Sequence, residues 1–368
     1  MKVVVTQENL HKGLVAVGRV VGSRVSLPVL SNVLLQTEGG RLKISATDLE
    51  IGLTTWIGAK VEKEGSITVP SRSFSEFVAS NTDQTITLDV DSLVMKVKTD
   101  HTEANFRGID AEEFPVVPTN DGEPNIVVSA PVFLQAIKQT IVAAATDDTR
   151  PVLAGLYFNW KEKQLRMAAT DSYRLAEKRI ELESAATEAK EVIIPSRCIN
   201  ELARVVAASS PDLVKLTIKD NQALFAFADT EIVSRLIDGK YPDYQKIIPE
   251  TMVTTAGLDT EEFKSTLRTV SIFAREASNV ATLHFGPENS IKLIAVASSL
   301  GDSNTSVAAE IDGQETEAKF NVKYLLDGVS VIGDEKLEFG LSGQYQPGMM
   351  KGVKSKDFRY IIMPLKTD

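Results

Sequence analysis

Residues 28–49 read PVLSNVLLQTEGGRLKISATDL, and residues 151–172 read PVLAGLYFNWKEKQLRMAATDS. Both stretches open with Pro-Val-Leu and carry Ala-Thr-Asp near their end, so that Asp48 and Asp171 lie 123 residues apart. Self-similarity at a fixed spacing is the sequence signature of a repeated architecture. The chain therefore contains at least two copies of one unit.

Two further matches keep the same order along the chain. ITVPSRSFSEFV at 67–78 corresponds to VIIPSRCINELA at 192–203. Each copy then closes with Ile-Asp followed by an aromatic residue and proline, at 109–115 and at 237–242. A period this long is not that of a short solenoid repeat, so each copy is long enough to have its own core.

A fainter third copy occupies the last third of the chain. SNVATLHFGPENSIKLIAVASSL at 278–300 stands where the next Pro-Val-Leu stretch belongs, with Ala-Ser-Ser in place of Ala-Thr-Asp. FNVKYLLDGV at 320–329 takes the place of the segment that follows Pro-Ser-Arg. We predict three related domains, at residues 1–122, 123–250 and 251–368, joined by stiff proline-rich linkers at 114–124 and 241–252.

Each copy is predicted to contain antiparallel β strands and two helices. The runs KISATDLEIGLTTWI and TITLDVDSLVMKVKT alternate with period two, and Gly39-Gly40 between apolar runs predicts a hairpin turn. A first helix is predicted over 7–21, because apolar residues share one of its faces. The apolar stripes of the three first helices are Leu10, Leu14, Val17 and Val21; Phe133, Ile137 and Ile141; and Phe263, Leu267, Val270 and Ala274. Six helices in a β-rich chain indicate the α+β class.

Helix starts are also visible in the sequence. Asp259, followed by Glu262, is predicted to cap the first helix of the third copy. Ser71 and Ser196, each after a proline, are predicted N-caps of the second helices.

The composition excludes several classes of protein. With 43% hydrophobic residues the chain can bury cores, and with 50 acidic against 40 basic side chains its net charge of -10 argues against a protein that coats nucleic acid over its whole surface. The single cysteine, Cys198, allows no internal disulfide and fits a reducing compartment. No secretion signal or membrane-spanning run is recognisable, so a cytoplasmic protein is expected.

Enzymatic motifs are largely absent. His11, His101 and His284 lack metal-ligand spacing, and no phosphate-binding glycine loop occurs, so neither a metal nor a cofactor is expected. One catalytic alternative uses the repeat: Asp48 and Asp171 could form the carboxylate pair of a duplicated aspartic hydrolase. The competing interpretation is that each Thr-Asp pair hydrogen-bonds local backbone at a strand end, and we favour it because the third copy has Ser299 instead.

Basic residues recur on or beside the predicted helices of this acidic chain. Singly, each is typical of a solvated helix face, but together they suit a track of sequence-independent phosphate contacts. The candidate DNA-facing residues are Lys12, Arg19, Arg24, Arg72, Lys138, Arg150, Arg197, Arg204, Lys264 and Arg268, with Arg275 beside them.

The order of LPVLSNVLL, LKISATDLEIG, ITVPSRSFSEFV, DDTRPVL, MAATDSYRLA, VIIPSR, YPDYQKIIP and a terminal YIIMPL closely resembles the bacterial DNA polymerase III beta subunits, the sliding clamps. The resemblance covers essentially the whole chain. It implies three clamp domains per chain and a head-to-tail homodimeric ring, with helices lining a hole that encircles double-stranded DNA. It also implies a non-enzymatic processivity factor in the bacterial cytoplasm, associated with the nucleoid.

The same resemblance implies a pocket between the second and third domains that binds short peptides of the replicative polymerase, the clamp loader and repair proteins. Carried over by motif, its residues are Leu153, Thr170, Ser172, Tyr173, Arg174, Leu175, Pro242, Lys246, Ile247, Ile361, Met363, Pro364 and Leu365. Arg174 is expected to fix a carbonyl or acid of the peptide. The implied dimer interface contains Phe106, Ile272 and Phe273.

Two other functions remain open at this point. A duplicated aspartic hydrolase needs Asp48 and Asp171 in contact, whereas a monomeric peptide-binding scaffold needs the pocket without ring closure.

Overall fold

The computed structural model describes residues 1–22, 27–120, 122–147, 149–286 and 288–366. By contacts the chain divides into two compact units, Met1–Ala130 with Arg197–Leu236 and Pro131–Ser196 with Ile237–Asp368. All strand pairs are antiparallel.

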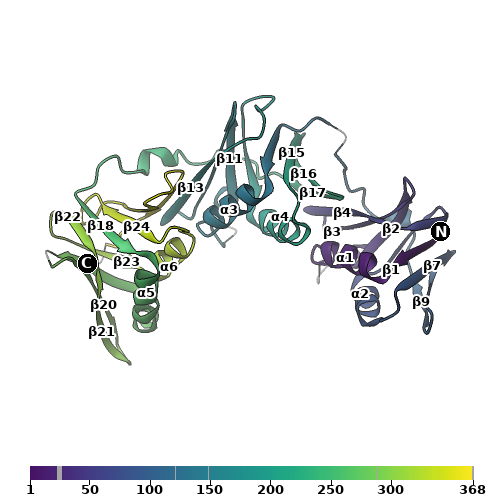
Figure 1. Cartoon of the computed structure of the whole chain (residues 1–368), viewed down its shortest axis with the longest axis horizontal. Coiled ribbons are helices and arrows are strands. Elements are labelled where there is room, and N and C mark those ends of the chain that lie inside the picture. The colour runs from purple at the N-terminus through teal and green to yellow at the C-terminus, as the bar shows by residue number, and fades with distance from the viewer. Residues whose placement is uncertain (23–26, 121, 148, 287, 367–368) are drawn as a thin grey trace. The chain divides into compact units, whose positions relative to one another are not determined.

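The first unit contains two sheets (Figure 1). Its five-stranded sheet has the order β5 (Lys60–Lys63), β1 (Lys2–Thr6), β7 (Thr85–Asp91), β8 (Val94–Lys98) and β9 (Glu103–Arg107). Its eight-stranded sheet has the order β10 (Ile126–Ser129), β15 (Leu213–Lys219), β16 (Gln222–Phe227), β17 (Thr230–Arg235), β4 (Ile51–Gly58), β3 (Arg41–Thr47), β2 (Asn32–Glu38) and β6 (Ser66–Pro70). Its helices are α1 (Gln7–Val17), α2 (Ser71–Ser80) and α4 (Ser196–Ser209), with the short 3-10 helices η1 (Pro28–Ser31) and η2 (Ala111–Glu113).

The second unit also contains two sheets. Its nine-stranded sheet has the order β14 (Lys190–Pro195), β11 (Gly155–Lys161), β12 (Gln164–Thr170), β13 (Arg174–Glu181), β26 (Phe358–Ile362), β25 (Gly348–Gly352), β24 (Lys336–Leu341), β18 (Thr254–Asp259) and β22 (Glu310–Gly313). Its four-stranded sheet has the order β21 (Gly301–Ala308), β20 (Ser290–Ala297), β19 (Val280–Gly286) and β23 (Thr316–Asn321). Its helices are α3 (Ala130–Ile141), α5 (Thr260–Ala274) and α6 (Val322–Ser330), with η3 (Pro151–Leu153), η4 (Tyr244–Ile247) and η5 (Arg275–Ala277).

The strand order repeats three times. An A group of four strands occurs as β6-β2-β3-β4, β14-β11-β12-β13 and β23-β19-β20-β21, and a B group occurs as β1-β7-β8-β9, β10-β15-β16-β17 and β18-β24-β25-β26. Within the described residues each copy also has two α-helices, six in total. The predicted α+β fold is therefore confirmed, including the third copy, whose sequence match is faint.

The large sheets continue from one copy of the repeat to the next. In the first unit β4 pairs with β17, and in the second unit β13 pairs with β26. Each of these two seams joins the last strand of an A group to the last strand of the next copy's B group. The remaining last strands, β9 and β21, each form the edge of a sheet.

Helix packing follows the predicted apolar stripes. Leu10, Leu14 and Val17 are fully buried in α1, as are Phe263, Leu267 and Val270 in α5. The carboxylate of Asp259 accepts the backbone N–H of Glu262, so the predicted cap is confirmed.

Two details of the helix boundaries were predicted wrongly. Helix α1 ends at Val17 rather than Val21, because the poor helix former Gly18 follows and the next turn tightens through a Val20 N–H bond to the Val17 carbonyl. Ser71 is not an N-cap: α2 already begins at Ser71, and its N-cap position is Pro70, which has no side chain able to cap.

The Gly39-Gly40 turn is confirmed, since both glycines have positive φ (57° and 74°) between β2 and β3. This backbone is that of the two-residue hairpin turns that match the twist of the flanking strands.

Cys198 lies on the buried face of α4 with no exposed surface. Burial raises the pKa of its thiol to about 12. Since the thiolate is the reactive species, a covered thiol with a raised pKa is inert in the folded protein.

We therefore expect iodoacetamide to alkylate Cys198 of the native protein at mildly alkaline pH on the order of a hundredfold more slowly than in the urea-unfolded chain. Mass spectrometry of the single-cysteine chain measures both rates directly. Equal rates in native and unfolded protein would contradict the buried position.

Candidate functional site

A tight turn connects β12 to β13. Thr170 Oγ1 donates to the carbonyl of Arg174 (2.6 Å) and accepts the N–H of Ser172 (3.1 Å). The Asp171 carboxylate accepts the N–H groups of Tyr173 (2.9 Å) and Arg174 (3.0 Å). Short polar side chains favour such turns because they reach their own backbone. Tyr173 in this turn is 55% exposed, whereas Arg174, the first residue of β13, is buried.

The first copy contains the same turn between β3 and β4. Thr47 Oγ1 donates to the Ile51 carbonyl, and Asp48 accepts the N–H groups of Glu50 and Ile51. The interpretation that both Thr-Asp pairs hydrogen-bond local backbone is therefore confirmed.

Neither aspartate is arranged like a catalytic carboxylate. Asp48 also pairs with Arg197 (2.5 Å), and Asp171 pairs with Arg174 Nε (3.0 Å). Each carboxylate is thus held by two backbone N–H groups and a guanidinium, whereas the two carboxyls of an aspartic hydrolase share one proton. This geometry speaks against the hydrolase alternative.

Arg174 is 7% exposed and anchors the start of β13. Its guanidinium pairs with Asp171 and Asp327 and lies 4.2 Å from the ring centroid of Tyr324. Burial alone would lower the pKa of Arg174, but Tyr360, Asp327 and Asp171 outweigh burial and raise it. The arginine that we expected to hold a peptide is thus already engaged within the protein.

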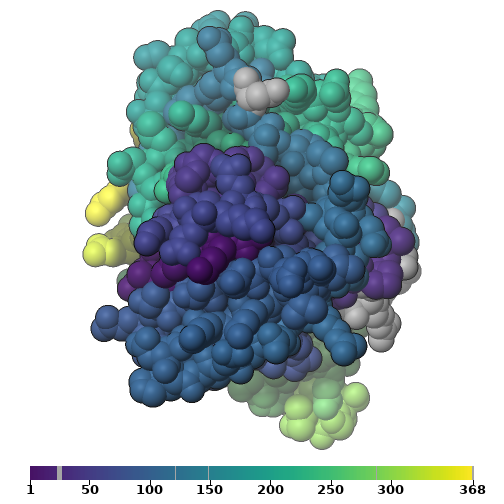
Figure 2. All heavy atoms as spheres, turned by 90° about the vertical axis from the view of Figure 1, so that its right-hand side faces the viewer, coloured from purple at the N-terminus to yellow at the C-terminus, as the bar shows by residue number. Residues whose placement is uncertain are grey.

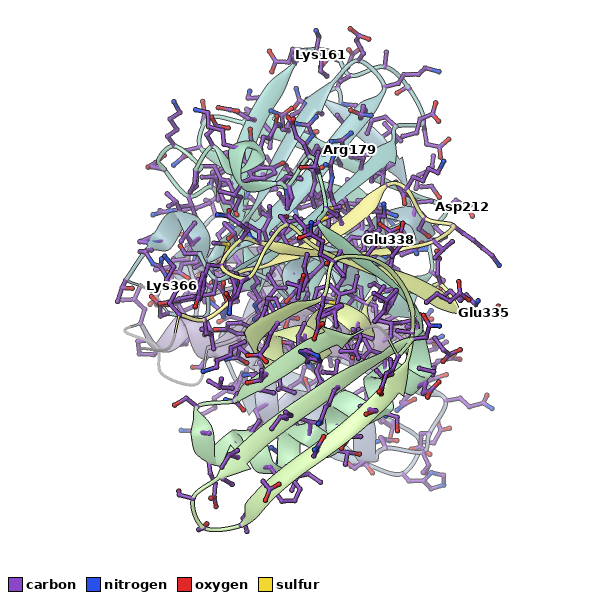
Figure 3. All side chains as sticks on the ribbon, turned by 90° about the vertical axis from the view of Figure 1, so that its left-hand side faces the viewer. Lys161, Arg179, Asp212, Glu335, Glu338 and Lys366 are labelled. Atoms are coloured by element: carbon purple, nitrogen blue, oxygen red, sulfur yellow. The ribbon has the colours of Figure 1, made fainter. Side chains whose placement is uncertain are left out.

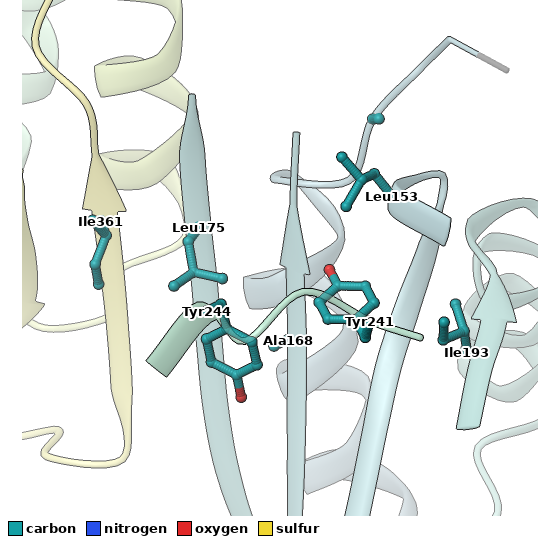
Figure 4. Close-up of a cluster of buried hydrophobic side chains, with 8 residues drawn as sticks. Leu153, Ala168, Leu175, Ile193, Tyr241, Tyr244 and Ile361 are labelled. Carbon is teal, nitrogen blue, oxygen red and sulfur yellow. The ribbon is translucent and has the colours of Figure 1, made fainter. Parts of the chain in front are cut away.

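Three of the candidate pocket residues belong to one apolar cluster beside this turn (Figure 4). Leu153 from η3, Leu175 from β13 and Ile361 from β26 are buried with Ala168, Ile193, Tyr241 and Tyr244. Tyr241 stacks on Tyr157 with ring centroids 4.8 Å apart. The two tyrosines of the YPDY segment are therefore part of the site, although the sequence analysis selected only Pro242, Lys246 and Ile247 from that linker.

A buried ionic network holds the linker against the sheet. The hydroxyl of Tyr244 donates to Glu177 (2.8 Å), which is 1% exposed. Arg179 and Arg359 contact the same carboxylate at 3.1 Å. Burial, together with Glu177, raises the pKa of Tyr244, so this hydroxyl remains a donor.

The C-terminal tail runs past the turn. Met363 N–H donates to the Tyr173 carbonyl (2.8 Å), and Leu365 N–H donates to the Lys319 carbonyl (2.8 Å). Met363, Pro364 and Leu365 are half-buried, while Ile247 remains 41% exposed and Lys246 pairs with Asp243 on the surface. The candidate pocket residues therefore come from four separate segments of the chain. Some are buried apolar side chains, and others are partly exposed.

The candidate DNA-facing residues occupy different environments. Lys138, Arg19 and Arg268 are exposed, whereas Lys12 and Arg72 are exposed but pair with Glu8 and Glu76 on the same helix. Arg24 lies outside the described residues.

Four others are engaged within the protein. Lys264 pairs with Glu261, Arg197 pairs with Asp48, and Arg204 donates from α4 to the Ala16 carbonyl (2.7 Å) at the end of α1. Arg150 donates to Ser172 Oγ (2.7 Å) and to the Asp171 carbonyl, which puts it beside the pocket residues.

The candidate interface residues lie near the two edge strands. Phe106 on β9 makes edge-to-face contacts with Phe74 and Phe77 of α2. Ile272 on α5 is 55% exposed and Phe273 is half-buried. Figure 2 shows the blue surface that includes β7 to β9, and Figure 3 shows the pale green sheet with β21 at its margin.

Among the described residues, no group of three or more His, Cys, Asp or Glu side chains could hold a metal ion. Nor is any helix in the described part of the chain long and apolar enough to cross a membrane.

Comparison with known proteins gives consistent matches along the whole chain. The models of the DNA polymerase III beta subunit match in order: its N-terminal domain at residues 1–118, its central domain at 127–243 and its C-terminal domain at 245–366. The beta sliding clamp of Synechocystis sp. is 31% identical over 388 residues, covering 100% of this chain and 99% of that protein.

Solved structures agree with these sequence matches. The DNA polymerase sliding clamp of Bacillus subtilis aligns with a TM-score of 0.95 at 27% identity, over 100% of both chains. The DNA polymerase III subunit beta of Pseudomonas aeruginosa aligns with a TM-score of 0.94 at 28% identity, again over 100% of both chains.

We expect Arg174→Met to lower the free energy of unfolding by about 3 kcal/mol, because it leaves buried Asp171 without its guanidinium. The matched control Lys246→Met removes only an exposed ion pair and should leave stability essentially unchanged. Urea unfolding followed by circular dichroism measures both. Equal losses in the two variants would contradict a structural role for Arg174.

Proposed function

Because the chain belongs to the DNA polymerase III beta subunit family, we propose that two copies form a ring that encircles duplex DNA and tethers the replicative polymerase to it. The proposal rests on how the sheets continue from one copy of the repeat to the next, through pairing of an A group with a B group. Two A–B seams are made within the chain, and the strands for a third, β21 and β9, are each left as a sheet edge. An unpaired edge strand is a template for pairing with another chain.

The proposed third seam joins β21 of one chain to β9 of a second copy. Such a contact is heterologous, and two copies close it into a ring when each contributes both edges. The helices support the same pairing: Arg204 links α4 to α1, and Gln139 on α3 donates to the Val331 carbonyl beyond α6 (3.1 Å). In both seams the first helix of one copy meets the second helix of the next, so α5 should meet α2 of a second chain. This pairing puts Ile272 and Phe273 opposite the aromatic group around Phe106.

The size of the proposed hole follows from the helices. Two chains, each with six α-helices among the described residues, supply twelve. Helices about 10 Å across set side by side give a circumference near 120 Å and a clear diameter of roughly 28 Å. A duplex passes through such a hole with room for water and ions. The ring then holds DNA by topology, and loose phosphate contacts permit sliding.

The charge distribution suits this arrangement. The chain is acidic overall, with a net charge of -10, which discourages DNA from binding to the outside. The exposed Lys138, Arg19 and Arg268 are the described basic residues best suited to counter phosphates inside the hole.

The surface around Tyr173 and Met363, backed by buried Leu175, is the proposed docking site for short peptides of the polymerase, the clamp loader and repair proteins. Aliphatic, aromatic and methionine side chains accept varied apolar anchors. In this reading the domains are 1–122, 123–250 and 251–368, the protein is not an enzyme, and it acts in the cytoplasm on nucleoid DNA.

The decisive test uses DNA topology. Protein loaded by a clamp loader onto nicked circular DNA should remain bound through gel filtration in high salt and should be released when the circle is cut once. Salt-resistant binding to linear DNA would contradict topological tethering.

We expect the double variant Ile272→Asp/Phe273→Asp to be a folded monomer, because two carboxylates would be buried in the seam. Light scattering should give 40.1 kDa for this variant and twice that mass for the unchanged chain. Val353→Asp, at a residue of matching exposure (54%), is the control and should remain dimeric. A dimer of unchanged stability in the double variant would contradict the interface, and a monomeric unchanged chain would favour the scaffold alternative.

Deleting residues 363–368 should reduce binding of polymerase-derived peptides at least about tenfold, because the deletion removes the Met363 contact with the Tyr173 turn. Fluorescence anisotropy measures the affinity, and light scattering should show that the dimer persists. Unchanged affinity would remove the pocket assignment.

A further inference from the structure

We propose that the β4–β17 seam carries a second, weaker peptide site, which accepts an aliphatic anchor followed by acidic residues. The inference rests on the proposed peptide-binding function of the first site. It concerns the hollow lined by Thr47, Leu49, Gly52, Val116 and Arg235, among others.

The hydrogen bonds of the turn in this region match those of the turn at the first site. The Thr47–Ile51 turn has the same side-chain and backbone hydrogen bonds as the Thr170–Arg174 turn. Leu49 has φ of 77° and Ser172 has φ of 79°, so the same left-handed residue occurs in both turns.

The strand beside each turn also makes an equivalent backbone hydrogen bond to it. Arg235 N–H donates to the Glu50 carbonyl (3.2 Å), as Met363 N–H does to the Tyr173 carbonyl. Arg235 therefore takes the place of Met363, and Glu50 takes the place of Tyr173. The apolar cluster behind the first site also has a counterpart, in which Phe114 packs with Val29 and Leu30.

The seam borders a partly open hollow of about 130 Å³. A cavity of about 150 Å³ accepts a benzene-sized group, so this space suits one aliphatic side chain. Gly52 stands where the first site has Leu175, and a Cβ on Gly52 would approach Val117 and Val233 to 2.7 Å. Glycine here lets the linker come close to the strand and form the wall of the hollow.

The rim indicates the chemistry of the occupant. Val116 is 92% exposed and Leu49 is 45% exposed, so apolar side chains border part of the opening. Arg235 is exposed and forms no ion pair with the other described residues. Glu50 lies on the same rim, and its carboxylate is 3.5 Å from Arg197, which also pairs with Asp48. The hollow has both aliphatic and polar lining residues. An exposed guanidinium beside such a hollow complements a peptide with a leucine followed by aspartates.

The two sites should therefore differ in preference. Methionine and tyrosine border the first, which suits apolar peptides, whereas the second requires an acidic group for Arg235. One chain could then hold two peptides at once, and a weaker second site would raise the local concentration of a partner displaced from the first.

The probe is a fluorescein-labelled peptide, acetyl-SLLDDS-amide, and a matched acetyl-SLLNNS-amide without the carboxylates. Anisotropy is measured with the full chain and with the chain lacking residues 363–368, which disables the first site. We expect the shortened chain to retain weak, salt-sensitive binding of the acidic probe and to bind the neutral probe at least about tenfold less tightly.

Variants in the shortened chain assign the residual binding. Arg235→Glu and Leu49→Asp, both at exposed positions, should each weaken it at least about tenfold. Lys215→Glu, an equal charge change on exposed β15 outside the hollow, should leave it unchanged.

No binding to the shortened chain, or binding indifferent to Arg235→Glu and Leu49→Asp, would overturn the second site. Failure of the first site is distinguished separately, because it predicts that polymerase-derived peptides bind the full and shortened chains equally.

Discussion

The fold depends on one constraint: the last strand of every sheet group has unpaired backbone donors and acceptors that need a neighbour. Within the chain this need is met twice, where β4 pairs with β17 and β13 with β26. Each pairing merges two copies of the repeat into one continuous sheet and also brings a first helix against a second helix. In the described part of the chain β9 and β21 remain at sheet edges, and the ring that we propose would pair them between two copies.

The same turn occurs at both of these equivalent seams, but different side chains surround it at each one. Thr-Asp at 47–48 and at 170–171 supplies the same hydrogen bonds to backbone. At one seam Tyr241 and Tyr244 from the linker complete an apolar cluster, and at the other Val117 lies over Gly52. The backbone geometry of the turn is thus the same in both copies, while the side chains around it differ between the two seams.

Charge in this protein has two distinct uses. Buried groups such as Arg174 and Glu177 fasten strand ends and linkers, and each is surrounded by partners that compensate for its burial. Exposed Lys138, Arg19 and Arg268 are the residues that we propose to counter phosphates. The distinction explains why Arg204 and Arg150, which look like helix-face cations in the sequence, serve instead to connect α4 with α1 and to brace the Asp171 turn.

The sequence by itself determined the three-fold repeat, the α+β class, the apolar helix stripes and the two Thr-Asp turns, because each depends on residues close together in the chain or on a pattern repeated along it. Only the tertiary structure decided which strands form the seams, where Arg204 and Arg150 point, and that Tyr244 reaches Glu177. Helix α1 also ended earlier than its stripe, since burial of Val20 favoured a tighter turn after Gly18. These features depend on contacts between residues far apart in sequence, for which local pattern contains no information.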